Sequence, residues 1–91
     1  MKINIRFAGY FRTLAERSAL KLELKEQATV EEALAVLDQA LEGRCHNAFY
    51  PNGTGSSAPN FFVVVETEIV DQETVLLEGN TMAIVPPMAG G

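Results

Sequence analysis

The feature that most constrains this sequence is a pair of alternating segments placed before a single capped helix. Residues 2–7 and 20–25 alternate polar and apolar side chains, which is the period of a half-buried strand. The apolar members are Ile3, Ile5 and Phe7 in the first segment and Leu20, Leu22 and Leu24 in the second. The two segments predict a hairpin with one apolar face.

The next segment carries the signals of an amphipathic helix. Thr29 can cap its start, and Glu32 stands three residues later, so each side chain can satisfy a free backbone N–H at the other position. Gly43 can adopt the left-handed conformation that ends a helix. The stripe at spacings of three and four consists of Val30, Ala33, Leu34, Leu37 and Leu41.

The rest of the chain predicts short strands separated by turns. Residues 44–60 contain several Gly, Ser and Pro residues and predict a long, mobile loop. The apolar run at 61–65 predicts a central strand buried on both faces. The other expected segments are a helical turn around Phe11, Leu14 and Ala15 within 9–18, a short strand at 68–70, a turn at 78–80 and a last strand at 81–85.

This order of elements predicts an α+β fold. Hairpin, helix and further strands cannot form a regular βαβ repeat, so we expect a mixed sheet packed on one main helix, the β-grasp arrangement. Its first and last strands would be parallel neighbours in the middle of the sheet. At 91 residues the chain predicts one domain at 1–85, followed by a flexible, extended tail at 86–91 that ends in Gly-Gly.

Charge and composition exclude several classes of function. The net charge is −5, and the second half of the chain is acidic, whereas nucleic acid and anionic membranes bind basic patches. An acidic half suits a protein partner with a basic groove, although acidic surfaces also serve solubility. No apolar run approaches a membrane span, and the alternating start does not resemble a signal peptide. We therefore expect a cytoplasmic protein, and the single Cys45 fits a reducing compartment.

The adjacent Cys45 and His46 are the obvious candidates for side-chain chemistry, and both are better read as ordinary residues. Zinc needs about four ligands, and the chain has no other cysteine or histidine, so no metal site is expected. A Cys–His nucleophile pair needs a scaffold, and these residues open the predicted loop. The sequence thus offers no convincing side-chain active site.

The C-terminus is the strongest functional signal. From Gly79 to Gly91 the chain has no charged side chain. Pro86 and Pro87 stiffen an extended exit from the sheet, and Gly90 and Gly91 remove side-chain bulk beside the terminal carboxylate. Such a tail can enter a narrow enzyme site, where ATP activates the carboxylate as an acyl-adenylate and a sulfur nucleophile displaces AMP. A frayed glycine-rich end is the alternative reading.

The sequence AIVPPMAGG at 83–91 resembles the tail of the small subunit of molybdopterin synthase, the MoaD family of ubiquitin-like sulfur carriers. The similarity covers the chain outside 44–60. The other similar pieces, in family order, are FA at 7–8, FRTLA at 11–15, ATV at 28–30, VV at 64–65, IV at 69–70 and LEGN at 77–80.

The resemblance implies a mechanism and two partners. An ATP-dependent adenylating enzyme activates Gly91, and sulfur transfer converts its carboxylate to a thiocarboxylate. The tail then inserts into the molybdopterin synthase large subunit, which supplies the catalytic side chains and forms the molybdopterin dithiolene. Gly90 provides clearance, and no cofactor is expected to stay bound to the carrier.

The resemblance also implies a partner-binding set. It consists of Phe7, Ile69, Val85, Pro86, Pro87, Met88 and Ala89. For Phe7, which is in phase with Ile3 and Ile5, burial in the core is an equally good reading.

Three other functions stay open from the sequence. The chain could be the related sulfur carrier of thiamine synthesis, which has the same chemistry. It could be a ubiquitin-like modifier that is joined to lysines through Gly91. It could also be a binding module that uses its sheet and leaves the tail inert.

Overall fold

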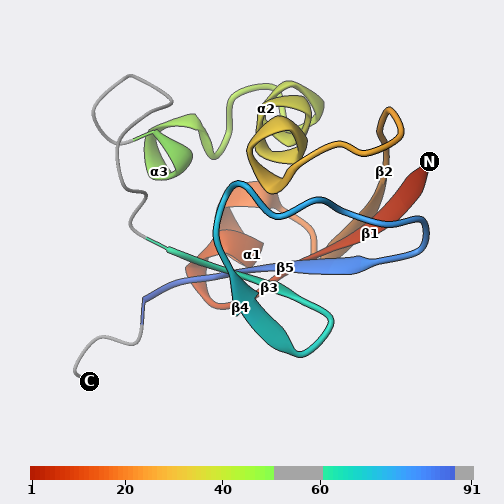
Figure 1. Cartoon of the computed structure of the whole chain (residues 1–91). Coiled ribbons are helices and arrows are strands. Elements are labelled where there is room, and N and C mark those ends of the chain that lie inside the picture. The colour runs from red at the N-terminus through yellow and green to blue at the C-terminus, as the bar shows by residue number, and fades with distance from the viewer. Residues whose placement is uncertain (51–60, 88–91) are drawn as a thin grey trace.

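The backbone follows the predicted order of strands around one main helix (Figure 1). The computed structural model describes residues 1–50 and 61–87. Its elements are β1 Lys2–Phe7, α1 Tyr10–Ala15, β2 Ala19–Glu23, α2 Val30–Ala40, α3 His46–Phe49, β3 Phe62–Val65, β4 Glu68–Val70 and β5 Thr81–Val85.

The strands form one mixed sheet in the order β2-β1-β5-β3-β4. β1 and β5 run parallel side by side, with Ile5 opposite Met82, and every other neighbouring pair is antiparallel. The parallel placement of the first and last strands near the centre of the sheet is confirmed. Because parallel strands end at the same edge, the segments that follow β1 and β5 lie close together.

The core lies between the sheet and the helices. Figure 1 shows α2 and α3 on one side of the sheet. Ile5, Met82 and Ile84 project from the two central strands and are fully buried. Leu34 and Leu37 of α2 are fully buried as well. Burial of each such side chain stabilises the fold by about 1.5–3 kcal/mol, so this layer supplies much of the stability.

Helix α2 begins with the predicted capping box. The Thr29 N–H donates to Glu32 Oε1 at 2.9 Å, and the Glu32 N–H donates to Thr29 Oγ1 at 3.2 Å. The Lys25 ammonium lies 2.9 Å from the second carboxylate oxygen of Glu32. Gly43 has the predicted left-handed conformation, at φ +80°, but α2 ends earlier, at Ala40, and the first left-handed residue after it is Glu42 at φ 55°.

Helix α1 confirms the helical turn predicted between the first two strands. Phe11 and Ala15 are buried, whereas Leu14 is exposed, so only two of the three predicted apolar positions face the core.

The prediction of a loop throughout 44–60 is wrong at its start. Residues His46–Phe49 form α3, and Phe49 is buried with its ring centroid 6.0 Å from Phe11 and 5.4 Å from Phe61. Cys45 precedes the helix and is also buried. These contacts hold a short helix that local sequence alone would not stabilise. Residues 51–60 lie outside the described part of the chain.

The prediction that the strand at 61–65 is buried on both faces is also wrong. β3 lies between β5 and β4, but Phe62 is 41% exposed while its neighbour Val63 is buried. The strand therefore has an inner and an outer face, because the described helices cover only one side of the sheet.

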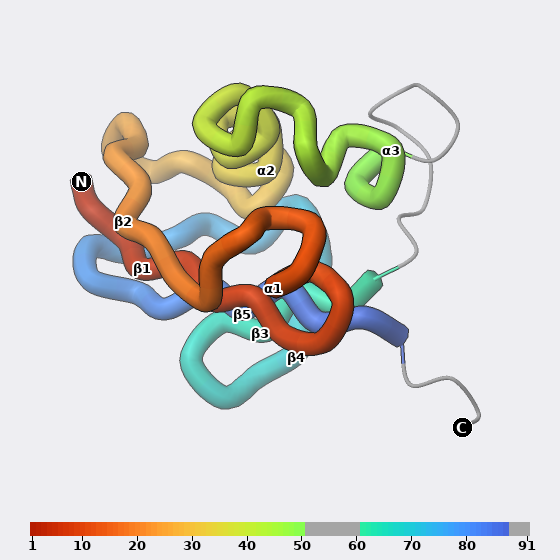
Figure 2. Tube along the Cα trace, turned by 180° about the vertical axis from the view of Figure 1, so that it is seen from behind, coloured from red at the N-terminus to blue at the C-terminus, as the bar shows by residue number. Residues whose placement is uncertain are grey.

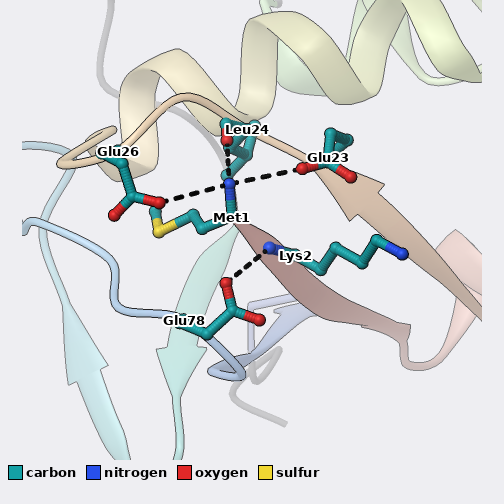
Figure 3. Close-up of polar contacts among 6 residues, drawn as sticks. All are labelled: Met1, Lys2, Glu23, Leu24, Glu26 and Glu78. Atoms are coloured by element: carbon teal, nitrogen blue, oxygen red, sulfur yellow. Dashed lines mark hydrogen bonds and ion pairs between the residues drawn. The ribbon is translucent and has the colours of Figure 1, made fainter.

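The start of the chain is tied to two neighbouring segments, as Figure 3 shows. The Met1 amine donates to the Leu24 carbonyl and lies 3.3 Å from a Glu23 carboxylate oxygen. The Lys2 N–H donates to Glu78 Oε1 at 3.0 Å. The surface carboxylates contribute little individually. Together these contacts join the start of β1 to the end of β2 and to the turn before β5.

Candidate functional site

The outer face of the sheet carries a contiguous apolar surface, although no described helix covers it. Side chains alternate along a strand, so the neighbours of the buried residues Val63, Met82 and Ile84 point outward. We call these outward apolar residues the outer patch, which consists of Phe62 and Val64 on β3, Ile69 on β4, and Ala83 and Val85 on β5.

The strand register brings the members of the outer patch together. Val64 lies opposite Ala83 on one side and opposite Ile69 on the other, and Phe62 lies opposite Val85. Directly opposite side chains on neighbouring strands are in contact range. Ile69 is 68% exposed, more than any other large apolar residue in the described part of the chain. A grouped apolar surface of this kind is typical of an interaction site.

A basic side chain extends the row that crosses the patch. Arg6 of β1 is paired in register with Ala83, so Arg6, Ala83, Val64 and Ile69 follow one another across four strands. Arg6 also lines a surface hollow of about 510 Å³. Its lining consists of Asn4, Ile5, Arg6, Ala19, Leu20, Lys21 and Thr81. Apolar and cationic chemistry therefore lie side by side on this face.

The structure distributes the sequence-predicted partner residues between the surface and the core. Ile69 and Val85 belong to the outer patch. Phe7 is only 5% exposed and lies in the core, the alternative that the sequence left open. Pro86 and Pro87 directly follow Val85 and are half-buried. The other predicted residues, Met88, Ala89, Gly90 and Gly91, lie outside the described part of the chain.

Sequence reasoning missed Phe62 and Val64 as surface residues. The apolar run around them favoured burial on both faces, and only the uncovered sheet face exposes them. The alternation of Thr81, Ala83 and Val85 against Met82 and Ile84 was the available signal that the neighbouring strand has two different faces.

The two side chains suited to nucleophilic chemistry, Cys45 and His46, have structural surroundings. Burial, together with the negative charge of Asp38, raises the pKa of the Cys45 thiol, so it stays protonated at neutral pH. His46 Nδ1 lies 2.9 Å from Asp38 Oδ2, which anchors α3 to α2. The expectation that Cys45 and His46 are ordinary structural residues agrees with this geometry, although they do not lie in a loop as predicted.

Residues 1–50 and 61–87 hold neither a metal-binding cluster nor a membrane-spanning helix. No group of three or more His, Cys, Asp or Glu side chains is arranged to hold a metal ion there. None of the helices in these ranges has the length and apolar character to cross a membrane.

Comparison with protein families gives one match. The sequence model of a family described as the ThiS family matches residues 5–91, which is nearly the whole chain and includes the Gly-Gly end. No curated protein matches the sequence.

Solved structures of low sequence identity share the fold. SAMP1 from Haloferax volcanii has a TM-score of 0.84 at 20% identity over 100% of both chains. A putative molybdopterin converting factor, subunit 1, from Pyrococcus furiosus has a TM-score of 0.69 at 21% identity, covering 97% of this chain and 99% of that one. A chain of the Amycolatopsis orientalis BexX/CysO complex has a TM-score of 0.71 at 22% identity, covering 98% and 99%. The fold is thus the ubiquitin-like β-grasp.

Proposed function

Because this chain belongs to the ThiS family of ubiquitin-like sulfur carriers, we propose that it carries sulfur for molybdenum cofactor biosynthesis as the small subunit of molybdopterin synthase. The reacting group is the carboxylate of Gly91. An ATP-dependent enzyme adenylates it with release of pyrophosphate, and a sulfur nucleophile displaces AMP to leave a thiocarboxylate. The large subunit then uses this sulfur and supplies the catalytic side chains, whereas ATP is bound by the adenylating enzyme. The proposed location is the cytosol.

The observation that carries the proposal is the continuity between the outer patch and the start of the tail. Val85 is the last residue of β5, it lies opposite Phe62, and Pro86 follows it directly. A partner that covers the patch therefore also contacts the base of the segment that ends in Gly91. Docking on one surface and delivery of the carboxylate into an enzyme site become a single event.

The side chains on the outer face of the sheet suggest the chemical character of the partner surface. Arg6 stands in the same cross-strand row as Ala83 and Val64, and no described residue forms an ion pair with it. The best complement is an apolar surface with a carboxylate beside it. Such a partner surface differs from the basic groove that the net negative charge of the chain favours. The reason is that the acidic side chains in the second half of the chain do not line the row that Arg6 and Ala83 begin.

One observation favours the molybdopterin pathway over thiamine synthesis. The Pro86-Pro87 pair before the final glycines resembles the tail of the molybdopterin synthase small subunit. The thiamine carrier uses the same tail chemistry, so a genetic test must separate the two pathways.

A second candidate is a protein modifier joined to lysines through Gly91. The full-length structural similarity to SAMP1, described in another structure as a small archaeal modifier protein, favours this alternative. Both functions begin with adenylation of the same carboxylate, and they differ only in the nucleophile that accepts the acyl group.

The test is mass spectrometry of the endogenous protein together with a deletion strain. We expect an intact chain that ends at Gly91, with a fraction in which one carboxylate oxygen is replaced by sulfur. We also expect loss of molybdoenzyme activity without thiamine auxotrophy. Lysine-linked branched peptides would establish the modifier instead. An unmodified tail in every state would contradict both and favour a binding module.

A further inference from the structure

The two segments that leave the parallel strands β1 and β5 contact each other. Gly9 follows β1 by two residues, and Pro86 follows β5 directly. The Ala8 N–H donates to the Ile84 carbonyl at 3.0 Å, which extends the parallel pairing to this edge. Figure 2 shows the turn from β1 into α1 beside the end of β5.

Gly9 has no space for a side chain, and Pro86 is the reason. A Cβ built on Gly9 would lie 2.7 Å from Pro86 Cγ, a distance that real Cβ atoms essentially never show, and 3.2 Å from Pro86 Cδ, which is also unusually tight. The backbone of Gly9, at φ 59° and ψ −138°, is also in a region that essentially only glycine occupies. Gly79 also has a positive φ, yet a Cβ there would meet nothing within 4 Å. Gly9 therefore differs from Gly79 in its contact with Pro86, although both residues have a positive φ.

The surroundings of Gly9 indicate whether residue 9 or Pro86 would move if position 9 carried a side chain. Phe7 and Phe11, two residues before and after it, are buried in the core. The Arg12 N–H donates to the Gly9 carbonyl at 3.1 Å and fixes the start of α1. Pro86, by contrast, lies beyond the last strand residue and is only half-buried. A side chain at position 9 would displace the proline ring rather than the body of the protein.

We propose that Gly9 is a positioning residue that seats the Pro86 ring and thereby sets the direction in which the chain leaves the sheet at Pro86 and Pro87. The inference rests on the proposed function, because the direction matters only if Gly91 must reach an enzyme site while the outer patch is docked. The proline ring packs against Gly9, which has no side chain. This contact fixes the direction of the chain at Pro86, the first residue after β5. Pro87 then follows from a defined position.

The first experiment uses the free protein and a double-mutant cycle. The variants are Gly9→Ala, Pro86→Ala and the double variant, with Gly79→Ala as the control for a positive φ without the contact. Pro86→Ala removes Cγ and Cδ and leaves only Cβ, which is 3.9 Å from the built Cβ of residue 9. We expect a nuclear Overhauser effect between Gly9 Hα and the Pro86 ring protons in the wild type. We also expect Gly9→Ala to shift the Val85 amide resonance more than Gly79→Ala does, and Pro86→Ala to reverse part of its stability loss.

The second experiment measures activation of the tail. Pyrophosphate exchange into ATP is followed with the adenylating enzyme that co-purifies with the wild-type chain. Gly9→Ala should lower kcat about tenfold or more with little change in KM, because docking is retained while the carboxylate is misplaced. Gly79→Ala should match the wild type. The double variant should recover part of the lost kcat.

The outcomes separate this inference from the proposed function. Absence of exchange with the wild-type chain would count against the proposed function, while the nuclear Overhauser effect and the mutant cycle would still decide whether Gly9 seats Pro86. Absence of that effect, additive stability losses in the cycle, or equal kcat values for Gly9→Ala and Gly79→Ala would each overturn the positioning role.

Discussion

Phe62 of β3 lies directly opposite Val85 of β5, so an exposed aromatic ring stands beside the last strand residue before the tail. Neighbouring strands are about 4.8 Å apart, which places Phe62 within one strand spacing of the point where the chain leaves the sheet. A partner that contacts Phe62 is therefore in reach of Pro86. This geometry makes the outer patch the natural place to separate binding from folding by mutation.

Replacing Ile69 with aspartate should abolish partner binding and leave the fold intact. Its side chain is 68% exposed, so a carboxylate there stays hydrated in the free protein. Surface substitutions of this kind usually change stability by no more than about 0.5 kcal/mol. In a complex, the same carboxylate would be buried without a partner, at a cost of several kcal/mol. Calorimetric titration with the large subunit and a thermal melt measure the two effects.

Leu77→Asp is the matched control for this variant. Leu77 is 66% exposed but lies in the segment before β5 and outside the outer patch, so the same change in charge should leave binding unaltered. Equal losses of affinity in the two variants would mean that binding does not depend on the patch. A large fall in melting temperature for Ile69→Asp would show that Ile69 supports the fold.

Arg6→Glu should slow association with the partner. Arg6 continues the row of Ala83 and Val64, and the proposed partner surface carries a carboxylate beside its apolar contact area. Reversing the charge should lower the association rate about tenfold at low salt, with a smaller difference at high salt, because mobile ions screen the interaction. Stopped-flow mixing at two salt concentrations gives both values. An unchanged association rate would place the complementary charges elsewhere.

Phe7→Ala should unfold the protein far more readily and should not weaken binding by itself. The Phe7 side chain is 5% exposed, and truncation of a buried phenylalanine typically costs about 3–5 kcal/mol. Urea denaturation measures this loss. Binding measured on the folded fraction at low temperature should keep nearly the wild-type affinity, and a marked loss there with little destabilisation would return Phe7 to the partner surface.

Local sequence signals predicted the strands and the main helix well. The alternation at 2–7 and the capping box of Thr29 and Glu32 are short-range patterns, and each is present in the structure. The parallel placement of β1 and β5 followed from the order of elements. These features depend on neighbours in sequence or on topology, both of which a single sequence contains.

The missed features depend on contacts between residues far apart in the chain. Helix α3 is held by the packing of Phe49 against Phe11 and Phe61, and no periodicity within four residues can reveal this. The exposure of Phe62 depends on which sheet face the described helices leave uncovered. The contact of Gly9 with Pro86 links positions far apart in sequence that only the parallel strands bring together.

The start of α2 should make stability sensitive to acid. The ammonium of Lys25 and, next, the backbone N–H of Thr29 lower the pKa of Glu32 from its ordinary value of 4.5. A lowered pKa stabilises the fold above the unfolded value, and this contribution is lost as pH falls through the folded pKa. Glu32→Gln should therefore reduce the urea midpoint near neutral pH and have a smaller effect once the pH has fallen below the folded pKa of Glu32. An equal effect at both pH values would exclude a contribution from the charge.

A charge in the last residues should block activation without affecting the fold. From Gly79 to Gly91 the chain has no charged side chain, as expected of a segment that enters a closed enzyme site. A buried unpaired carboxylate costs several kcal/mol, and about 1.4 kcal/mol already suffices for a tenfold loss. Met88→Glu should thus lower both adenylation and synthase activity about tenfold or more, whereas the uncharged Met88→Gln should retain most activity. Melting temperatures of both should match the wild type. Full activity of Met88→Glu with both partners would rule out threading of the tail and would favour a module whose tail is inert.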